Sequence, residues 1–107
     1  MTTISLCMIV KDEEPVLQRC LDSLRGLMDE IIIVDTGSSD RTKEIALQYT
    51  DQVYDYQWEN DFAKARNYAA SFATCDYIYT ADADEVLDEE NREKFRQLKQ
   101  VLLPEIE

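Results

Sequence analysis

Four short apolar runs alternate with four segments of helical periodicity, and this alternation is the strongest constraint on the fold. The runs lie at 4–10, 31–34, 52–56 and 76–80. The first two are almost continuously apolar, as in strands buried on both faces of a parallel sheet, whereas 52–56 alternates and indicates a shorter strand near an edge. The βαβαβαβα order, without an internal repeat or linker, predicts an α/β domain with a mainly parallel, right-handed, doubly wound sheet.

Breaking residues mark the expected helix boundaries. Pro15 suits the first turn of a helix that Gly26 closes, and the next helix is expected to end near Thr50. The last helix is expected to begin at about Asp88 and to end at Pro104. In each helix apolar side chains recur at helical spacing, namely Leu17, Cys20, Leu21 and Leu24, then Ile45, Ala46 and Tyr49, then Phe62, Ala65, Ala69 and Phe72, then Phe95, Leu98 and Leu102.

Length and charge restrict the class of protein. A chain of 107 residues predicts a single domain over 1–107, near the low end for an independent α/β enzyme. The net charge of −12 argues against a nucleic-acid polymer as partner, because duplex binding depends on many Lys and Arg contacts to phosphate. No apolar run has the length of a membrane-spanning helix and no basic residue precedes the first run, so we expect no transmembrane segment and a cytoplasmic location.

The cysteines and the absence of histidine restrict the chemistry. Cys7, Cys20 and Cys75 are odd in number, lack C-x-x-C spacing and lie inside apolar segments, which favours buried thiols over disulfides or a zinc site. The chain has no His, so general-base chemistry by His and His-ligated metals are excluded within it.

Polar clusters follow three of the expected strands, at Lys11–Glu14, Asp35–Asp40 and Asp82–Glu85. Ligands bind doubly wound sheets at the carboxyl ends of the strands, so the three clusters should converge on one edge. The third cluster holds three carboxylates within four positions, which repel one another unless a cation, a ligand or water stabilises them, and carboxylate oxygens suit Mg²⁺ or Mn²⁺. Taken alone, this Asp-x-Asp (DxD) spacing also fits an acidic, solvated turn.

Four stretches together resemble family 2 glycosyltransferases of the Rossmann-like GT-A fold. In chain order they are Ser5–Glu14, Asp29–Asp40, Trp58 with Asp61–Asn67, and Asp82–Glu85. The Trp58 block is most similar to the bacterial branch found beside tetratricopeptide repeats. The resemblance implies that a nucleotide-sugar, usually a UDP-sugar, binds across the strand ends with Mn²⁺ or Mg²⁺, and that the sugar passes to an acceptor with inversion.

The resemblance also implies roles for single residues. Asp84 would bind the metal that bridges to the diphosphate, Asp82 would contact the ribose or the metal through water, and Glu85 would support the turn or hold a metal-bound water. Arg66 would face the nucleotide with its guanidinium, although a helical Arg also pairs with nearby carboxylates. Asn67 would hydrogen-bond the base or the loop, or pack locally.

The first two clusters would hold the base. Val10 would contribute backbone groups, and Asp35 would accept an N–H from uracil, or else bond the amides of the turn at Gly37 and Ser38. Glu14 would line the pocket or favour the N-terminus of the first helix.

Two positions depart from the family pattern. Thr36 stands where many relatives have a second Asp, and Asp12 stands where relatives usually have Asn. The added charge of Asp12 beside a diphosphate would need Lys11 or the metal to compensate it. These departures leave the exact base specificity open.

No catalytic base is identified within 107 residues. Inverting transfer needs a group that deprotonates the acceptor hydroxyl, which the family supplies from a segment well beyond the metal motif. We therefore expect a truncated, N-terminal nucleotide-binding half that binds the donor without transferring the sugar. Its last strand and helix should expose apolar surface, which favours self-association.

Two other classes of protein stay open from the residues. A phosphorelay receiver domain binds Mg²⁺ at acidic strand ends, which Lys11–Glu13 and Asp35 superficially supply, but its fourth strand should not end in Asp82–Asp84. A non-catalytic binding module could share the fold, because fold alone does not establish function. Neither the sugar nor the acceptor can be inferred from these residues.

Overall fold

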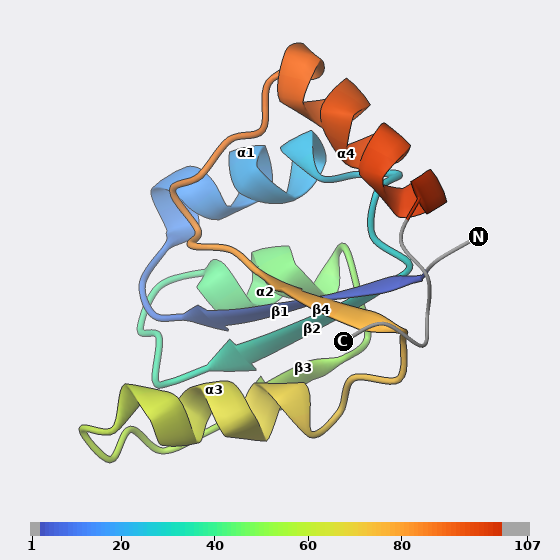
Figure 1. Cartoon of the computed structure of the whole chain (residues 1–107). Helices are drawn as coiled ribbons and strands as arrows, with labels where there is room; N and C mark the ends of the chain where they lie inside the picture. The colour runs from blue at the N-terminus through green and yellow to red at the C-terminus, as the bar shows by residue number, and fades with distance from the viewer. Residues whose placement is uncertain (1–2, 102–107) are drawn as a thin grey trace.

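The computed structural model describes residues 3 to 101, which form a twisted sheet with helices on both faces (Figure 1). The α/β class and the βαβαβαβα order are confirmed. The elements are β1 (Ile4–Val10), α1 (Glu14–Ser23), β2 (Glu30–Asp35), α2 (Thr42–Leu47), β3 (Val53–Asp55), α3 (Phe62–Ala70), β4 (Tyr77–Thr80) and α4 (Glu89–Val101).

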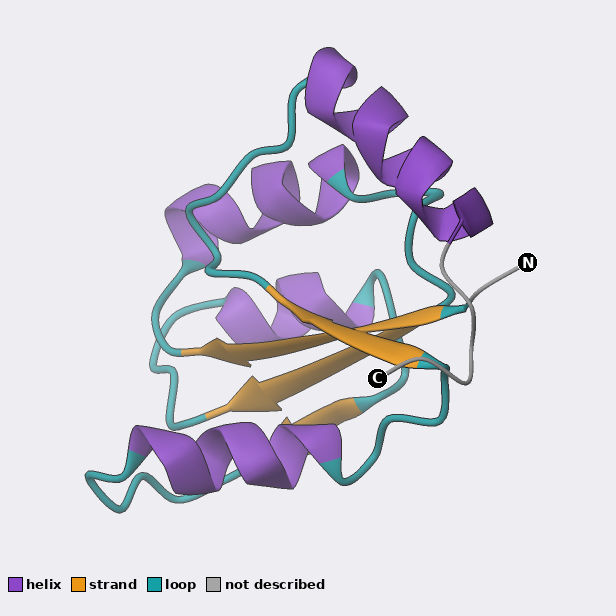
Figure 2. Cartoon of the chain, viewed as in Figure 1, coloured by secondary structure: helices purple, strands orange, loops and turns teal. Residues whose placement is uncertain are grey.

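The sheet has the order β3-β2-β1-β4, and each neighbouring pair is parallel (Figure 2). The chain therefore adds strands in one direction from β1 to β3 and then returns across β1 to place β4 on its other side. The position of β3 at an edge confirms its prediction. Because the strand order reverses between β1 and β4, the carboxyl ends of these two strands form the switch point at which α/β sheets bind ligands.

The core lies on both faces of the central strands, as the continuous apolar runs predicted. Leu6, Met8 and Val10 of β1 pack in the cluster that contains the buried side chains of α1. Cys7 belongs to a second cluster with Ala69 of α3. Since successive side chains of a strand point to opposite faces, β1 separates α1 and α2 from α3.

Several predicted boundaries shift. α2 ends at Leu47 rather than near Thr50, because Gln48 and the next residues continue as a turn. Cys75 is only partly buried, unlike the predicted thiol, because it precedes the edge strand β4. The predictions for Leu102 and Pro104 fall outside the described residues.

Cationic side chains hold α4 against the end of α1. The buried Lys99, only 7% exposed, donates to the carbonyl of Leu27 at 3.0 Å and to Asp29 Oδ2 at 2.7 Å. Arg92 donates to the carbonyls of Ser23 and Arg25. These contacts satisfy carbonyls that the end of a helix leaves unpaired. Within residues 3 to 101, neither α4 nor another helix is long and apolar enough to span a membrane.

Glu30 of β2 bonds to β1 and to the segments that precede β3 and β4, at the amino-terminal edge of the sheet. Its Oε1 accepts from Ser5 Oγ at 2.7 Å and from the Thr74 amide at 2.9 Å, and its Oε2 accepts from Thr74 Oγ1 and Gln52 Nε2, both at 3.0 Å. Burial acts to raise the pKa of Glu30, but these hydrogen bonds outweigh it and lower the pKa to about 2. The folded state therefore favours the ionised carboxylate.

We expect Glu30→Gln to lower the free energy of unfolding by about 1 to 2 kcal/mol near pH 7, because hydrogen bonds to the charged carboxylate are lost. A carboxylate whose pKa is lowered by folding stabilises the folded state fully at pH values above its pKa in the unfolded chain, here 4.5. That stabilisation is lost as the pH falls toward the folded-state pKa of about 2. Urea unfolding at about pH 7 and about pH 3 should therefore show a smaller difference between wild type and variant at the lower pH. The exposed Glu44→Gln is the control, and a difference that does not change with pH would contradict the assignment.

Candidate functional site

The loops after β1 and β2 are joined by hydrogen bonds. Asp12 Oδ1 accepts from the Ser39 amide at 2.7 Å, and the Asp12 amide donates to Ser38 Oγ at 2.9 Å. Asp12 has a φ of +53°, in the left-handed region that Asn and Asp tolerate better than other side chains. This geometry explains how Asp replaces Asn here, and its carboxylate is engaged by the second loop.

Glu14 extends this connection to the start of α2. Its amide donates to Asp40 Oδ2 at 3.2 Å, and its Oε1 accepts from the Arg41 amide at 3.1 Å. The Glu13 amide donates to Thr42 Oγ1 at 2.7 Å. Glu14 lies in the first turn of α1 and lines neither of the cavities described below, and the bond of its carboxylate to the start of α2 is a contact that neither of its two predicted roles included.

Asp35 forms the turn that was one of its two predicted alternatives, and contact with the base remains a prediction. Its Oδ1 accepts from the amides of Gly37 at 2.8 Å and Ser38 at 2.7 Å, which forms the turn after β2. Gly37 has a φ of +114°, which suits glycine. Asp35 is 3% exposed, and its Oδ2 has no hydrogen-bond partner among the described residues. A buried acceptor without a partner is costly, so Oδ2 is suited to accept a donor from a ligand.

The acidic loop, residues 81–85, is shaped by alternating small and charged side chains. Ala81 and Ala83 are buried in the core cluster that α1 lines, and this exposes the intervening Asp82 and Asp84. Glu85 Oε1 accepts from the Asp82 amide at 3.0 Å, which confirms its predicted support of the turn. The sequence Ala-Asp-Ala-Asp therefore directs two carboxylates outward from a backbone held by the core.

Glu13 faces the acidic loop across the switch point, and the sequence placed it in the first polar cluster without predicting a role for it alone. Burial, followed by the charges of Asp84 and Asp82, raises the pKa of Glu13. Its position directly before α1 was the available signal, because that segment and the acidic loop follow adjacent strands. The three polar clusters thus converge as predicted and concentrate negative charge there.

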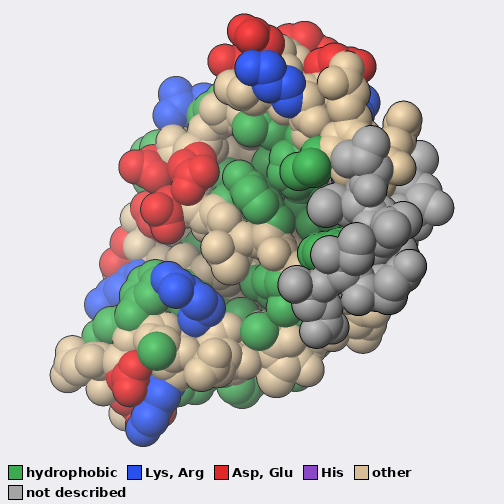
Figure 3. All heavy atoms as spheres, in the orientation of Figure 1, with side chains coloured by type: hydrophobic (Ala, Val, Ile, Leu, Met, Phe, Trp, Pro, Cys, Tyr) green, Lys and Arg blue, Asp and Glu red, His purple; other side chains and the backbone are tan. Residues whose placement is uncertain are grey.

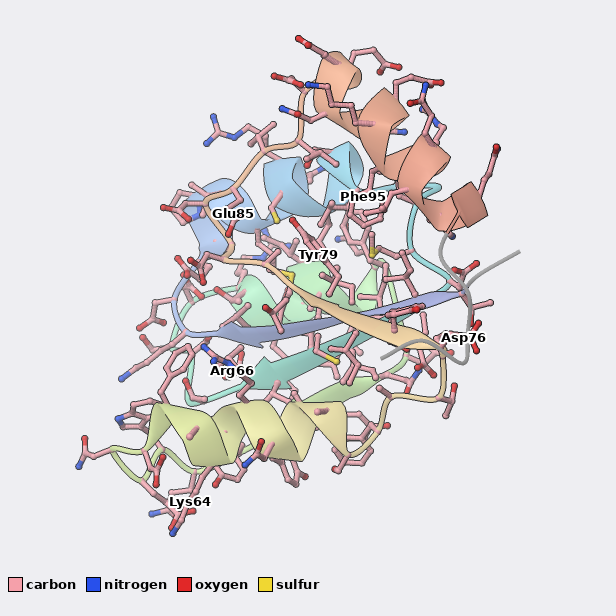
Figure 4. All side chains as sticks on the ribbon, viewed as in Figure 1. Lys64, Arg66, Asp76, Tyr79, Glu85 and Phe95 are labelled. Carbon is pink, nitrogen blue, oxygen red and sulfur yellow. The ribbon has the colours of Figure 1, made fainter. Side chains whose placement is uncertain are left out.

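The first cavity, here called the switch-point cavity, has a volume of about 200 Å³ between β1, α3 and the acidic loop. Arg66 lines it from α3, and Figure 4 shows this side chain reaching toward the strand ends while Lys64 points away. Among the described residues Arg66 pairs with no carboxylate, and its guanidinium lies 4.9 Å from the ring centre of Phe62. The cavity is lined by Cys7, Ile9, Phe62, Arg66, Ala69, Thr80, Ala81, Asp82 and Glu85.

A second cavity, here called the aromatic cavity, has a volume of about 320 Å³ and adjoins the first. The two share Ile9 and Phe62 in their walls. The second is lined by Ile9, Val10, Lys11, Glu13, Thr36, Trp58 and Phe62. Together the two cavities run along the carboxyl ends of β1, β2 and β4.

Lys11, Val10 and Asn67, which were predicted from the sequence to bind the nucleotide, differ in their positions relative to these cavities. Lys11 lines the aromatic cavity. Val10 also lines it, but its carbonyl accepts from both the amide and the hydroxyl of Thr36, at 3.0 and 3.3 Å, so this backbone group is engaged. Asn67 is exposed on α3 and lines neither cavity.

The side chains at the acidic loop suit a cation that shares its coordination shell with a ligand. No group of three or more His, Cys, Asp or Glu side chains within residues 3 to 101 is arranged to enclose a metal. Mg²⁺ and Mn²⁺ are commonly held by one or two carboxylates together with substrate phosphates and water, and exposed Asp82 and Asp84 fit that arrangement. Figure 3 shows carboxylates gathered at this end of the molecule, with basic side chains below them.

Comparisons with known proteins agree with this geometry. The model of the family "Glycosyl transferase family 2" matches residues 5–99. A TPR repeat-containing protein of Synechococcus elongatus is 48% identical over 87 residues, which are 81% of this chain and 22% of that protein. Glycosyltransferase SunS of Bacillus phage SPbeta is 36% identical over 102 residues, which are 94% of this chain and 24% of SunS. The chain thus spans about a quarter of these relatives, and the predicted likeness to TPR-associated proteins is confirmed.

Solved structures show the same fold. S. aureus TarS 1-349 superposes with a TM-score of 0.69 at 23% identity, over 89% of this chain and 31% of TarS. Glucosyl-3-phosphoglycerate synthase from Mycobacterium tuberculosis, in complex with Mn²⁺ and UDP-glucose, gives a TM-score of 0.63 at 26% identity, over 79% of this chain and 34% of that enzyme. The predicted GT-A fold is confirmed, and the family match shows that this chain belongs to glycosyl transferase family 2.

Proposed function

We propose that this chain is a nucleotide-sugar-binding domain of a glycosyltransferase that uses a UDP-sugar and a divalent cation. The observation that carries the proposal is the pair of adjoining cavities at the switch point, with Arg66 and Asp82 in the walls of the first. Asp84 lines neither cavity but is exposed on the same loop, two residues after Asp82. A cation at the carboxylates and the guanidinium would together neutralise a diphosphate. The phosphorelay alternative is set aside, because the family match covers residues 5–99.

The proposed donor is supported by a relative. Glucosyl-3-phosphoglycerate synthase, 26% identical, has been crystallised with Mn²⁺ and UDP-glucose, and its sheet superposes on this one. In our proposal Asp84 binds Mn²⁺ or Mg²⁺ directly and Asp82 contacts the ribose or a metal-bound water. The bound cation would supply electrostatic stabilisation of the departing nucleoside diphosphate.

The remaining residues hold the base and the diphosphate in this proposal. The unpartnered Oδ2 of Asp35 would accept an N–H of uracil, and Arg66 and Lys11 would face the nucleotide phosphates. Asn67 would act at the base only if α3 adjusts, since it lines neither cavity. The cytoplasmic location predicted from the sequence remains a prediction.

We expect Asp84→Asn to weaken the metal-dependent part of UDP binding by about 10-fold or more, equivalent to about 1.4 kcal/mol. The amide keeps the shape of the side chain but removes the charge that binds the cation. Calorimetric titration with UDP, with and without Mn²⁺, measures this change.

The control variant is Glu90→Gln, because Glu90 is an exposed carboxylate on α4 that lines neither cavity. It should bind UDP with the metal dependence of the wild type, and GDP serves as the comparison nucleotide. Unchanged metal dependence in Asp84→Asn would show that another group binds the cation.

We also expect purified 1 to 107 to bind the donor without transferring the sugar by inversion. No residue of this chain matches the base with which the family deprotonates an acceptor hydroxyl. The measurement is release of UDP from UDP-glucose with Mn²⁺ and a panel of hydroxyl acceptors, beside a binding titration that shows the donor site to be formed. Sustained acceptor-dependent release would refute this expectation.

β4, α4 and the segment between them expose apolar side chains that we propose to drive self-association. Ile78 on the edge strand β4 is 48% exposed, and Val86 and Leu98 are exposed to a similar extent. Among the described strands β4 lies at the edge of the sheet, and an exposed apolar residue on such a strand favours pairing with another chain.

We therefore expect the average mass in light scattering to rise with protein concentration at about 0.15 M salt, where the repulsion between acidic chains is screened. Ile78→Lys should lower the association, because a charge is placed on the edge strand. Leu47→Lys, on the exposed face of α2, is the matched control. A monomer at every concentration would count against the proposal.

A further inference from the structure

Two aromatic rings stand exposed in the wall of the aromatic cavity. Trp58 is 39% exposed and Phe62 is 49% exposed, although exposure of large apolar side chains to water is unfavourable. Their ring centres lie 6.2 Å apart in an edge-to-face arrangement. Exposed apolar surface that is rimmed by polar groups commonly marks a binding site.

The loop that carries Trp58 is held in place by its own side chains. Tyr56 donates its hydroxyl hydrogen to Glu59 Oε1 at 2.9 Å, and Trp58 Nε1 donates to Asn60 Oδ1 at 3.1 Å. Asp61 then caps α3 by accepting from the Lys64 amide. The indole ring is therefore oriented before any ligand arrives, which lowers the entropic cost of binding.

A carboxylate oxygen of Asp35 that lacks a hydrogen-bond partner among the described residues lies next to residues of the aromatic cavity. Asp35 is the register partner of Val10 and directly precedes Thr36, and both of these residues line the aromatic cavity. Its Oδ2 is buried and has no partner among the described residues. A flat, apolar-faced ring that also carries an N–H would satisfy the exposed aromatic faces and this oxygen together.

The side chains in the walls distinguish the two ends of the site. The switch-point cavity has Arg66, Asp82 and Glu85 in its walls, and it suits a phosphate group with a cation. The aromatic cavity also contains the charged Lys11 and Glu13, but it alone is lined by Trp58, and it adjoins the first cavity through Ile9 and Phe62. A nucleotide matches this division, because its phosphates and its heterocyclic base lie at opposite ends.

We infer that the indole of Trp58 is the platform on which the nucleobase of the bound nucleotide stacks, with Phe62 packed edge-to-face beside it. This inference rests on the proposed function and adds to it the residue that recognises the flat face of the base. Asp35 would then contact the edge of the base, and Trp58 its face. Trp58 is a substrate-contacting residue in this assignment and takes no part in bond making.

The chain contains a single Trp, so its fluorescence reports on this site directly. We expect UDP with Mg²⁺ to quench the emission of Trp58, because stacking brings the uracil ring against the indole. Pyrophosphate with Mg²⁺ has no base and should leave the emission unchanged. Equal quenching by pyrophosphate would overturn the inference, since the change would then report phosphate binding alone.

Substitution tests the same contact by affinity. In calorimetry with Mg²⁺, Trp58→Ala should weaken UDP binding by about 10-fold or more, whereas Trp58→Phe should retain most of it. Leu47→Ala removes an equally exposed apolar side chain outside both cavities and should change nothing. Circular dichroism shows whether each variant is folded. If a variant does not fold, the fluorescence quenching of the wild-type chain still tests the contact, because it needs no substitution.

The outcomes distinguish a failure of the proposed function from a failure of the stacking platform. If the wild-type chain does not bind UDP in the presence of Mg²⁺ or Mn²⁺, the proposed function fails. If it binds UDP and Trp58→Ala binds equally well, the platform is wrong while the function stands. If affinity for UDP-glucose falls in Trp58→Ala but affinity for UDP does not, the rings hold the sugar and the assignment to the base is overturned.

Discussion

The burial of β1 on both faces is the constraint on which the rest of the site depends. Its side chains pack against α1 and α2 on one side and against α3 on the other, while its backbone pairs with β2 and β4. Every loop that carries a candidate residue begins at the end of β1 or of a strand near it. Because close-packed cores resist displacement, the carboxyl ends of these strands keep a fixed spacing. The cleft is a consequence of that spacing, with its walls supplied by α3 and the acidic loop.

The polar groups at the site divide into those that the fold uses and those that it leaves available. Asp12 and Glu14 join the first two loops through backbone amides, so their negative charge is partly offset by donors. Asp82 and Asp84 remain exposed, and Asp35 has one oxygen engaged and one unpartnered. A ligand therefore meets a limited set of unsatisfied groups in a framework whose other hydrogen bonds are already formed. This division is what the proposed binding of a metal and a nucleotide depends on.

Much of the fold followed from periodicity, because β1 and β2 are nearly pure apolar runs whose burial leaves few alternatives. The convergence of three polar clusters also followed from the parallel order. The shape of individual loops did not. Glu13 was missed because its proximity to Asp84 depends on how two loops from adjacent strands approach each other. The hydrogen bonds from Thr36 to the Val10 carbonyl likewise depend on the register between β1 and β2. The exposure of Trp58 depends on a short loop that is fixed by local hydrogen bonds. Such contacts arise between residues distant in sequence or from turn geometry, and no periodic signal encodes them.

The attachment of α4 bears on how this domain can vary. Arg92 and Lys99 bond to backbone carbonyls, which every residue type provides, and Lys99 also pairs with the Asp29 carboxylate, so among the receiving side chains only that of Asp29 contributes to the anchors. The chain between β4 and α4 is consequently tied at both ends, and residues 81–85 lie within it. An insertion or deletion in that segment would have to displace either a core strand or an anchored helix. The connection from β4 to α4 should therefore keep its length among related sequences.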